Sequence, residues 1–125
     1  MFLVAKKITL SLGNLILKKN KLLESLEALS NLESISGDLE VIRNDTLSSL
    51  NGLDGIQSNS IDNINICYNA CLSTCNVQSI CDYLSAPTGV INIYANTAGC
   101  NSPGNIANSC GFAMPCLPYG NYWIY

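Results

Sequence analysis

The cysteines are the residues of this chain with the widest range of possible chemistry, and all of them lie in its second half. They are Cys67, Cys71, Cys75, Cys81, Cys100, Cys110 and Cys116. A nucleophilic cysteine needs a histidine base, and the chain contains no histidine. A zinc site would need thiolates alone at irregular spacing, without a CxxC pair. The pattern favours disulfides formed in an oxidising compartment, and the odd count leaves at least one thiol free or paired outside the chain.

Other catalytic patterns are weak. Asp38 and Glu40 flank Leu39, so we expect them beside each other on one strand face, solvated and not opposed across a cleft as in a glycosidase. Asn44-Asp45-Thr46 matches a glycosylation sequon, but Asn44 is expected to point inward. The sequence has no glycine-rich phosphate loop and no calcium loop. We expect no enzyme activity, metal or cofactor; a hydrolase on a repeat scaffold is the less favoured alternative.

The elements that position these residues come from an internal repeat. Residues 13–36 align without a gap to residues 37–60, and this period of 24 residues lies within the range of leucine-rich repeats. The identical pairs are Gly13/Gly37, Leu15/Leu39, Asn20/Asn44, Leu23/Leu47, Ser25/Ser49, Leu26/Leu50, Leu29/Leu53 and Ser34/Ser58. A third copy follows at an offset of 25 residues, and a weaker fourth copy includes residues 91–96.

The start of each repeat predicts a short strand and then a bend. Leucine, isoleucine or valine at alternate positions point to one side of a strand, and successive strands are expected to form a parallel sheet. An asparagine follows each strand, and its amide can bond the unpaired backbone groups of the bend. The asparagines expected to form this inward row are Asn20, Asn44, Asn69 and Asn96.

The rest of each repeat predicts an arm that returns to the next strand. Leucines spaced by three over residues 21–35 suit an amphipathic helix. The equivalent segment of the second repeat contains Ser48-Ser49 and Asn51-Gly52, which make a poor helix. We therefore favour irregular or short 3-10 arms over helical ones.

Two short helices are predicted near the cysteine-bearing end. The first covers residues 77–84 and is capped by Thr74 or Asn76. The second covers residues 103–109, with Ser102 as N-cap and a proline at the first helical position. The fold expected for the whole chain is a leucine-rich-repeat-like right-handed solenoid of short parallel β-strands, with irregular or 3-10 arms and two short cap helices.

Residues 80–110 read ICDYLSAPTGVINIYANTAGCNSPGNIANSC. This segment resembles the C-terminal cap of bacterial receptor L-domain-like leucine-rich-repeat surface proteins, and residues 13–110 fit that family. The resemblance implies disulfides among the cysteines that match the cap, in any of three connectivities. Those cysteines are Cys75, Cys81, Cys100 and Cys110, whereas Cys67 and Cys71 do not belong to the family's pattern.

The expected organisation has four parts. They are a partial leading repeat at 1–12, leucine-rich repeats at 13–86, a cysteine-containing cap at 87–110, and a tail or the start of a following unit at 111–125. The chain contains no run of about 18 apolar residues, the length needed to span a membrane. Its first residues do not form a secretory signal. We therefore expect a piece of a longer protein that is extracellular or exposed on a cell surface.

The distribution of charge argues against nucleic acid as a partner. All six basic residues fall within the first 43 positions, and the chain after Arg43 carries four aspartates and no cation. Phosphate binding needs lysines and arginines clustered over a surface. The cluster Lys18-Lys19-Lys21 is interpreted as a solvated edge.

The outer face of the predicted sheet is the candidate binding surface. Its candidate residues are Glu40, Ile42, Asn65, Asn92 and Tyr94. Ile42 and Tyr94 are singled out because exposed apolar or aromatic side chains among polar neighbours suit recognition. The expected function is non-catalytic recognition or adhesion, with a protein or glycan at a cell surface as partner. A purely structural spacer is the alternative, in which these residues have no special role.

Overall fold

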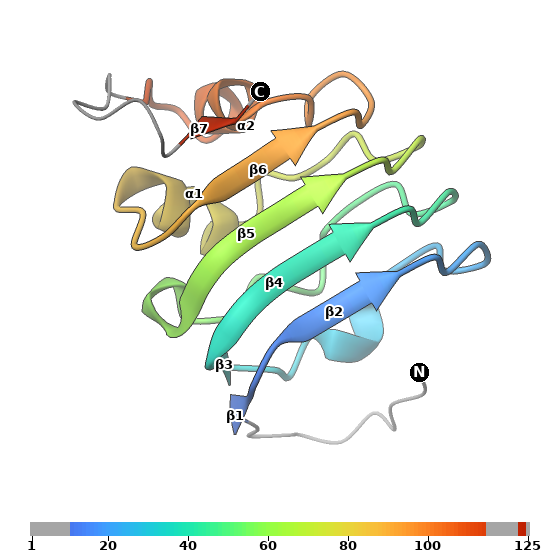
Figure 1. Cartoon of the computed structure of the whole chain (residues 1–125), viewed down its shortest axis with the longest axis horizontal. Coiled ribbons are helices and arrows are strands. Elements are labelled where there is room, and N and C mark those ends of the chain that lie inside the picture. The colour runs from blue at the N-terminus through green and yellow to red at the C-terminus, as the bar shows by residue number, and fades with distance from the viewer. Residues whose placement is uncertain (1–10, 115–122, 125) are drawn as a thin grey trace.

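A parallel β-sheet forms the centre of the computed structural model, which describes residues 11–114 and 123–124 (Figure 1). Strands β2 (Leu15–Lys18), β4 (Gly37–Ile42), β5 (Ile61–Cys67) and β6 (Ile91–Tyr94) lie side by side in chain order, and β7 (Trp123–Ile124) follows β6. Two shorter strands, β1 (Ser11–Leu12) and β3 (Ser34–Ile35), form a separate parallel pair. Together with two helices, these strands make a small α/β domain.

The strands pair in the register that the repeat predicts. Leu15 is the partner of Leu39, Leu39 is the partner of Ile64, and Ile64 is the partner of Ile91. Leu39, Ile64 and Ile91 have no exposed surface. Because side chains alternate across a strand, one face of the sheet is apolar and packs against the returning arms.

The arms are irregular apart from two 3-10 turns, η1 (Glu27–Leu29) and η2 (Ser58–Ser60). The leucines spaced by three enter the core, since Leu26, Leu29 and Leu32 are between 2% and 4% exposed. The amphipathic helix considered for residues 21–35 is therefore wrong. A spacing of three residues also matches the period of a 3-10 turn, which is why the pattern suited both.

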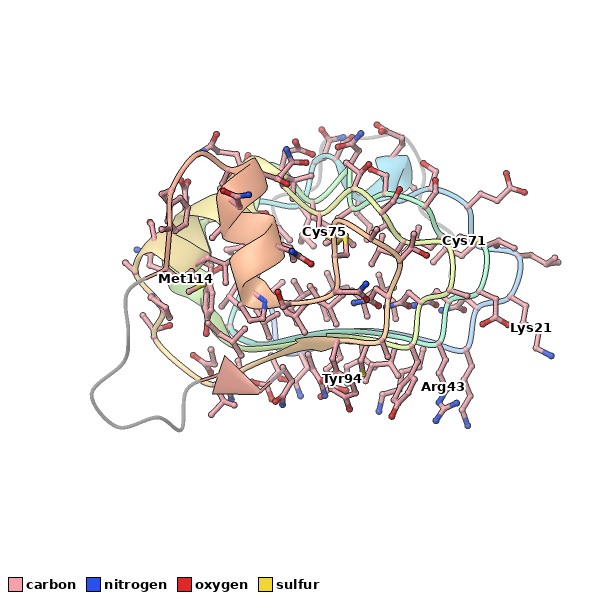
Figure 2. All side chains as sticks on the ribbon, turned by 90° about the horizontal axis from the view of Figure 1, so that it is seen from above. Lys21, Arg43, Cys71, Cys75, Tyr94 and Met114 are labelled. Carbon is pink, nitrogen blue, oxygen red and sulfur yellow. A yellow bond between two sulfur atoms is a disulfide. The ribbon has the colours of Figure 1, made fainter. Side chains whose placement is uncertain are left out.

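The two α-helices, α1 (Gln78–Ser85) and α2 (Pro103–Ser109), pack against each other. Both lie on one side of the sheet, and Arg43 and Tyr94 extend from the opposite side (Figure 2). The predicted cap of α2 is confirmed, because the hydroxyl of Ser102 accepts a hydrogen bond from the backbone amide of Asn105 at 3.1 Å.

The predicted cap of α1 is wrong. The N-cap position is occupied by Val77, and neither Thr74 nor Asn76 caps the helix. Thr74 instead pairs with Ser49 in a parallel β-bridge, and its backbone amide donates to the carbonyl of Ser48 at 3.2 Å. The contact with the preceding repeat therefore places Thr74 away from the start of the helix.

Two disulfides hold the helical end together. Cys75 is bonded to Cys100 and Cys81 to Cys110, with Cα–Cα distances of 5.9 and 5.7 Å. The first bond joins the arm after β5 to the segment after β6, and the second joins α1 to the residue that follows α2. The four cysteines that match the cap are thus paired in one of the three possible ways.

Other sequence expectations fall partly outside this structure. Cys67 and Cys71 are free, but Cys116, residues 1–10 of the leading repeat and residues 115–122 of the tail lie outside the described residues. Within residues 11–114 and 123–124, no helix has the length and apolar character needed to cross a membrane.

Candidate functional site

A row of asparagine side chains runs along the bends that follow the strands. The Oδ1 of Asn44 accepts hydrogen bonds from the backbone and side-chain amides of Asn20, at 3.2 and 3.0 Å. The Oδ1 of Asn69 accepts hydrogen bonds from the backbone and side-chain amides of Asn44, at 3.0 and 3.2 Å. The Oδ1 of Asn96 accepts hydrogen bonds from the backbone and side-chain amides of Asn69, at 3.1 and 2.9 Å. The four predicted asparagines therefore form one continuous chain of hydrogen bonds.

The row ends at a residue that the repeat pattern does not reveal. The backbone amide of Asn96 donates to Oδ1 of Asn101 at 3.0 Å, and the Nδ2 of Asn96 donates to the carbonyl of Cys100 at 2.7 Å. Asn101 follows Asn96 by only five residues, so no periodic search would find it. The sequence marks it only by its place beside Cys100, within the segment 80–110 that resembles a cap.

The residue before each asparagine of the row has a left-handed backbone. Lys19, Arg43, Tyr68 and Ala95 have φ values of 57°, 59°, 59° and 56°. None of them is glycine, so each such conformation costs roughly 1–2 kcal/mol. These residues occupy the same place in successive repeats, and their side chains therefore leave the chain along one edge of the molecule.

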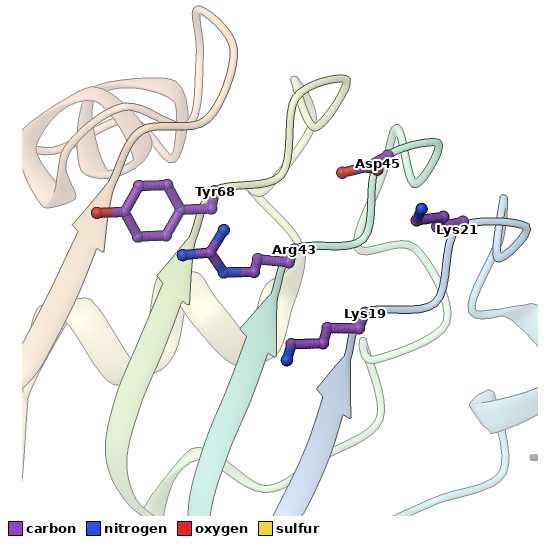
Figure 3. Close-up of a pocket in the computed structure, with 5 residues that line it drawn as sticks. All are labelled: Lys19, Lys21, Arg43, Asp45 and Tyr68. Carbon is purple, nitrogen blue, oxygen red and sulfur yellow. The ribbon is translucent and has the colours of Figure 1, made fainter.

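Three of these left-handed residues line a pocket at the ends of β2, β4 and β5 (Figure 3). Lys19, Arg43 and Tyr68 are joined there by Lys21 and Asp45, and the pocket has a volume of about 280 Å³. We refer to these five residues as the bend pocket. The lysine cluster interpreted as a solvated edge thus contributes two side chains to a pocket.

The aromatic side of the bend pocket is held by two contacts. The guanidinium carbon of Arg43 lies 4.7 Å from the centroid of the Tyr68 ring, a cation–π distance. The ring of Tyr94 contacts Tyr68 edge to face, with centroids 5.4 Å apart and planes at 79°. Tyr68 still exposes 45% of its surface, so an ordered aromatic ring is presented to solvent.

The outer face of the sheet brings the predicted binding residues into two adjacent rows. Glu40, Asn65 and Asn92 are register partners in one row, and Ile42 and Tyr94 lie in the other. All five are half-buried, so Ile42 and Tyr94 are less exposed than expected. The larger exposed apolar side chains of this face are Ile16 at 47% and Val90 at 39%.

Some of the polar groups on this face already interact with other groups of the protein. Glu40 forms an ion pair with Lys18, with 3.3 Å between nitrogen and oxygen. The Oδ1 of Asn92 is buried and has no hydrogen-bond partner among the described residues, so a ligand in solution cannot reach it. Asn65 accepts a hydrogen bond from the thiol of Cys67 at 3.6 Å.

Cys67 lies between Ile42 and Tyr94 in its row, but it is only 3% exposed. Burial raises the pKa of the Cys67 thiol above its usual value of 9.0. The hydrogen bond with Cys67 raises the pKa of Tyr94 to about 12. Both groups are therefore protonated at neutral pH, and a protonated buried thiol is a poor nucleophile.

Asp38 is not simply solvated as expected, because it takes part in a second row of polar contacts at the starts of the strands. Its backbone amide donates to Oδ1 of Asn14 at 2.8 Å, and its carboxylate accepts from the backbone and side-chain amides of Asn63 at 3.2 and 2.9 Å. Asn63 in turn accepts from the backbone amide of Val90 at 2.8 Å. These contacts give Asp38 a structural role.

Among the described residues, no group of three or more histidine, cysteine, aspartate or glutamate side chains could hold a metal ion. The chemistry available at the strand ends is instead hydrogen bonding, charge and aromatic contact. Comparisons with protein-family models, with curated proteins and with solved structures found no match for this chain.

Proposed function

We propose that this chain is a non-catalytic recognition module of an extracellular or cell-surface protein, and that its partner is a surface protein or glycan. The proposal includes a leucine-rich-repeat solenoid related to the bacterial receptor L-domain-like proteins. Its binding surface combines the outer face of the sheet with the bend pocket.

The solenoid is supported by the regular spacing of contacts between repeats. The asparagine row links residues 24, 25 and 27 positions apart, and four strands pair in parallel in chain order. A single core runs behind them from Leu15 to Ile106. An extracellular location is supported by the two disulfides, because such bonds persist in oxidising compartments.

Recognition is supported above all by the fixed and exposed Tyr68 ring. Tyrosine offers a large contact area with few rotatable bonds, and rigid aromatic anchors dominate binding energy at interfaces. Here the ring is held by Arg43 and Tyr94 while 45% of Tyr68 stays accessible. A surface that only separated neighbouring domains would have no need of such an anchor.

The test is to apply the oxidised full chain to arrays of immobilised glycans and of cell-surface proteins. We expect saturable binding to at least one partner, and loss of most of that binding in Tyr94→Ala. Leu22→Ala is the matched control, because Leu22 is an apolar side chain with 91% exposure that lies outside both the sheet face and the bend pocket and should bind as the unchanged chain does. A chain that binds nothing on either array would be a spacer, and the proposal would be wrong.

A further inference from the structure

We infer that the bend pocket binds an acidic sugar, meaning a sugar ring that carries a carboxylate or a sulfate group. This inference rests on the proposed recognition function and names a ligand class for one part of its surface. It is carried by the charge, the contacts and the size of the pocket.

The basic residues of the described chain gather at this one edge. Residues 11–114 contain four of them, Lys18, Lys19, Lys21 and Arg43, and the last three line the pocket. Lys18 is paired with Glu40, whereas no carboxylate of the described residues forms an ion pair with the other three. The chain as a whole has a formal net charge of −3. A local group of unpaired cations on an acidic protein attracts anions to that place.

Arg43 is suited to hold an anionic group. Its guanidinium is ordered by the Tyr68 ring at 4.7 Å, and a guanidinium binds a planar carboxylate or a sulfate through two parallel hydrogen bonds. Lys19 extends from the neighbouring bend toward the same space (Figure 3). An anion at this place would therefore meet at least two cations.

The rest of the pocket favours a sugar over a bare anion or a polyphosphate. The exposed ring of Tyr68 offers a flat apolar surface for the C–H face of a pyranose. Asp45 also lines the pocket; its carboxylate accepts hydrogen bonds from sugar hydroxyl groups, and it repels a densely charged polyphosphate more strongly than a sugar ring with one charged group held by Arg43. The volume of about 280 Å³ lies near the lower end of ligand pockets, at about 300 Å³, which suits one or two rings.

The backbone conformation brings the side chains that line the pocket together. Lys19, Arg43 and Tyr68 each adopt a left-handed conformation that glycine would adopt at lower cost. The same conformation occurs at Ala95 outside the pocket, so the strain belongs to the repeated bend and is maintained by the asparagine row. Here the strain places three long side chains around one space.

The experiment is a titration of the oxidised, ¹⁵N-labelled full chain followed by two-dimensional NMR. The probes are trigalacturonic acid, which carries carboxylates, lactose 6-sulfate, which carries a sulfate, and lactose, which carries neither. Inorganic sulfate and acetate test the anions alone. We expect at least one acidic sugar to shift the backbone amides of Arg43 and Tyr68 in a saturable manner, and to bind at least tenfold more tightly than lactose or the free anion.

Variants locate the binding. Arg43→Gln should weaken it about tenfold, because a charge-assisted hydrogen bond is lost. Tyr68→Ala should weaken it about fivefold through loss of the aromatic face, and Ala95 shows that alanine is accepted at an equivalent bend. Lys18→Gln is the control: it removes the same charge from the same edge but outside the pocket, and should change the affinity less than twofold.

Three results would overturn the inference. They are equal binding of lactose, equal binding of inorganic sulfate or acetate, and equal weakening by Lys18→Gln and Arg43→Gln. Failure of the inference can be told from failure of the proposed function. A partner found on the arrays whose binding depends on Tyr94, together with no saturable shift of Arg43 or Tyr68 by either acidic sugar, would leave recognition intact and overturn the acidic-sugar inference.

Discussion

At the scale of single residues, the left-handed bends are the most unusual feature of this chain. They recur at Lys19, Arg43, Tyr68 and Ala95, each directly before an asparagine of the hydrogen-bonded row. The hydrogen bonds of that row hold the bend, so the strain persists without glycine. The cost at each bend can be measured by substitution.

Ala95→Gly should stabilise the protein by up to about 1.5 kcal/mol. Glycine removes the left-handed penalty of roughly 1–2 kcal/mol. It also destabilises the folded protein by about 0.5–1 kcal/mol, because it increases the entropy of the unfolded chain. Urea unfolding measures the difference. Ala98→Gly is the control, because Ala98 is exposed nearby without a positive φ and should only lose stability. A loss of stability in both variants would contradict strain at the bend.

Gly52→Ala should destabilise the protein by about 3 kcal/mol or more, because it combines left-handed strain with a steric clash. Gly52 has φ of +115°, and an added Cβ would collide with the carbonyl of Leu26 in the preceding repeat. Gly111→Ala separates the two causes, since Gly111 has φ of +97° but nothing within 4 Å of an added Cβ. Thermal unfolding should show a clearly smaller loss for Gly111→Ala; equal losses would argue against close contact between the repeats.

At the scale of elements, the asparagine row connects the bends with the sheet. The Nδ2 of Asn69 donates to the carbonyl of Val41 at 2.8 Å as well as to Asn96, and its Oδ1 accepts two bonds from Asn44. A single side chain therefore satisfies two backbone groups of the preceding repeat and bonds the row asparagine on either side of it. Buried polar groups of this kind are costly when left unpaired.

Asn69→Ala should lower the free energy of unfolding by about 3 kcal/mol or more, because each buried polar group left without a partner costs roughly 1–3 kcal/mol. Asn59→Ala is the matched control, since Asn59 is exposed, and should stay within about 0.5 kcal/mol of the unchanged protein. Denaturant unfolding of both variants provides the measurement. Similar small effects would show that the row contributes little to stability.

The strands and their register could be predicted from the sequence, whereas the pocket could not. Register follows from the alternation of buried residues, so Leu15, Leu39 and Ile64 could be aligned from spacing alone. The bend positions carry Lys19, Arg43, Tyr68 and Ala95, which share no residue type. Only the backbone geometry brings such different side chains to one edge.

Contacts between neighbouring repeats explain the other differences. The cap expected at Thr74 is absent because Thr74 pairs with Ser49 in the preceding repeat, and a local signal does not reveal such a contact. Asp38 has the residue type of a solvated acid but receives hydrogen bonds from Asn63. In both cases a neighbouring repeat determines what the residue does.

At the scale of the whole molecule, stability is expected to be uneven. The disulfides Cys75–Cys100 and Cys81–Cys110 lie at the helical end, and each should contribute about 2–4 kcal/mol. The middle of the sheet, by contrast, is held by β4 and β5 without a covalent link. Reduction should therefore affect one end of the molecule first.

Hydrogen exchange before and after reduction tests this expectation. With a reductant, amides of residues 71–110 should exchange faster, while amides of β4 should keep most of their protection, because local opening follows the loss of local constraints. The double variant Cys75→Ser, Cys81→Ser without reductant should reproduce the pattern. Unchanged protection in residues 71–110 would count against disulfides at the helical end.

The hydrogen bonds between repeats join equivalent positions of successive repeats, so the chain is built from interchangeable units. Asn44 bonds forward to Asn69 much as Asn20 bonds forward to Asn44. An in-frame duplication of residues 37–60 would therefore present each new side chain with partners of the kind it already has, whereas an insertion of a single residue within a strand would invert inside and outside. Lengthening by whole units is thus the change of size that this architecture tolerates best.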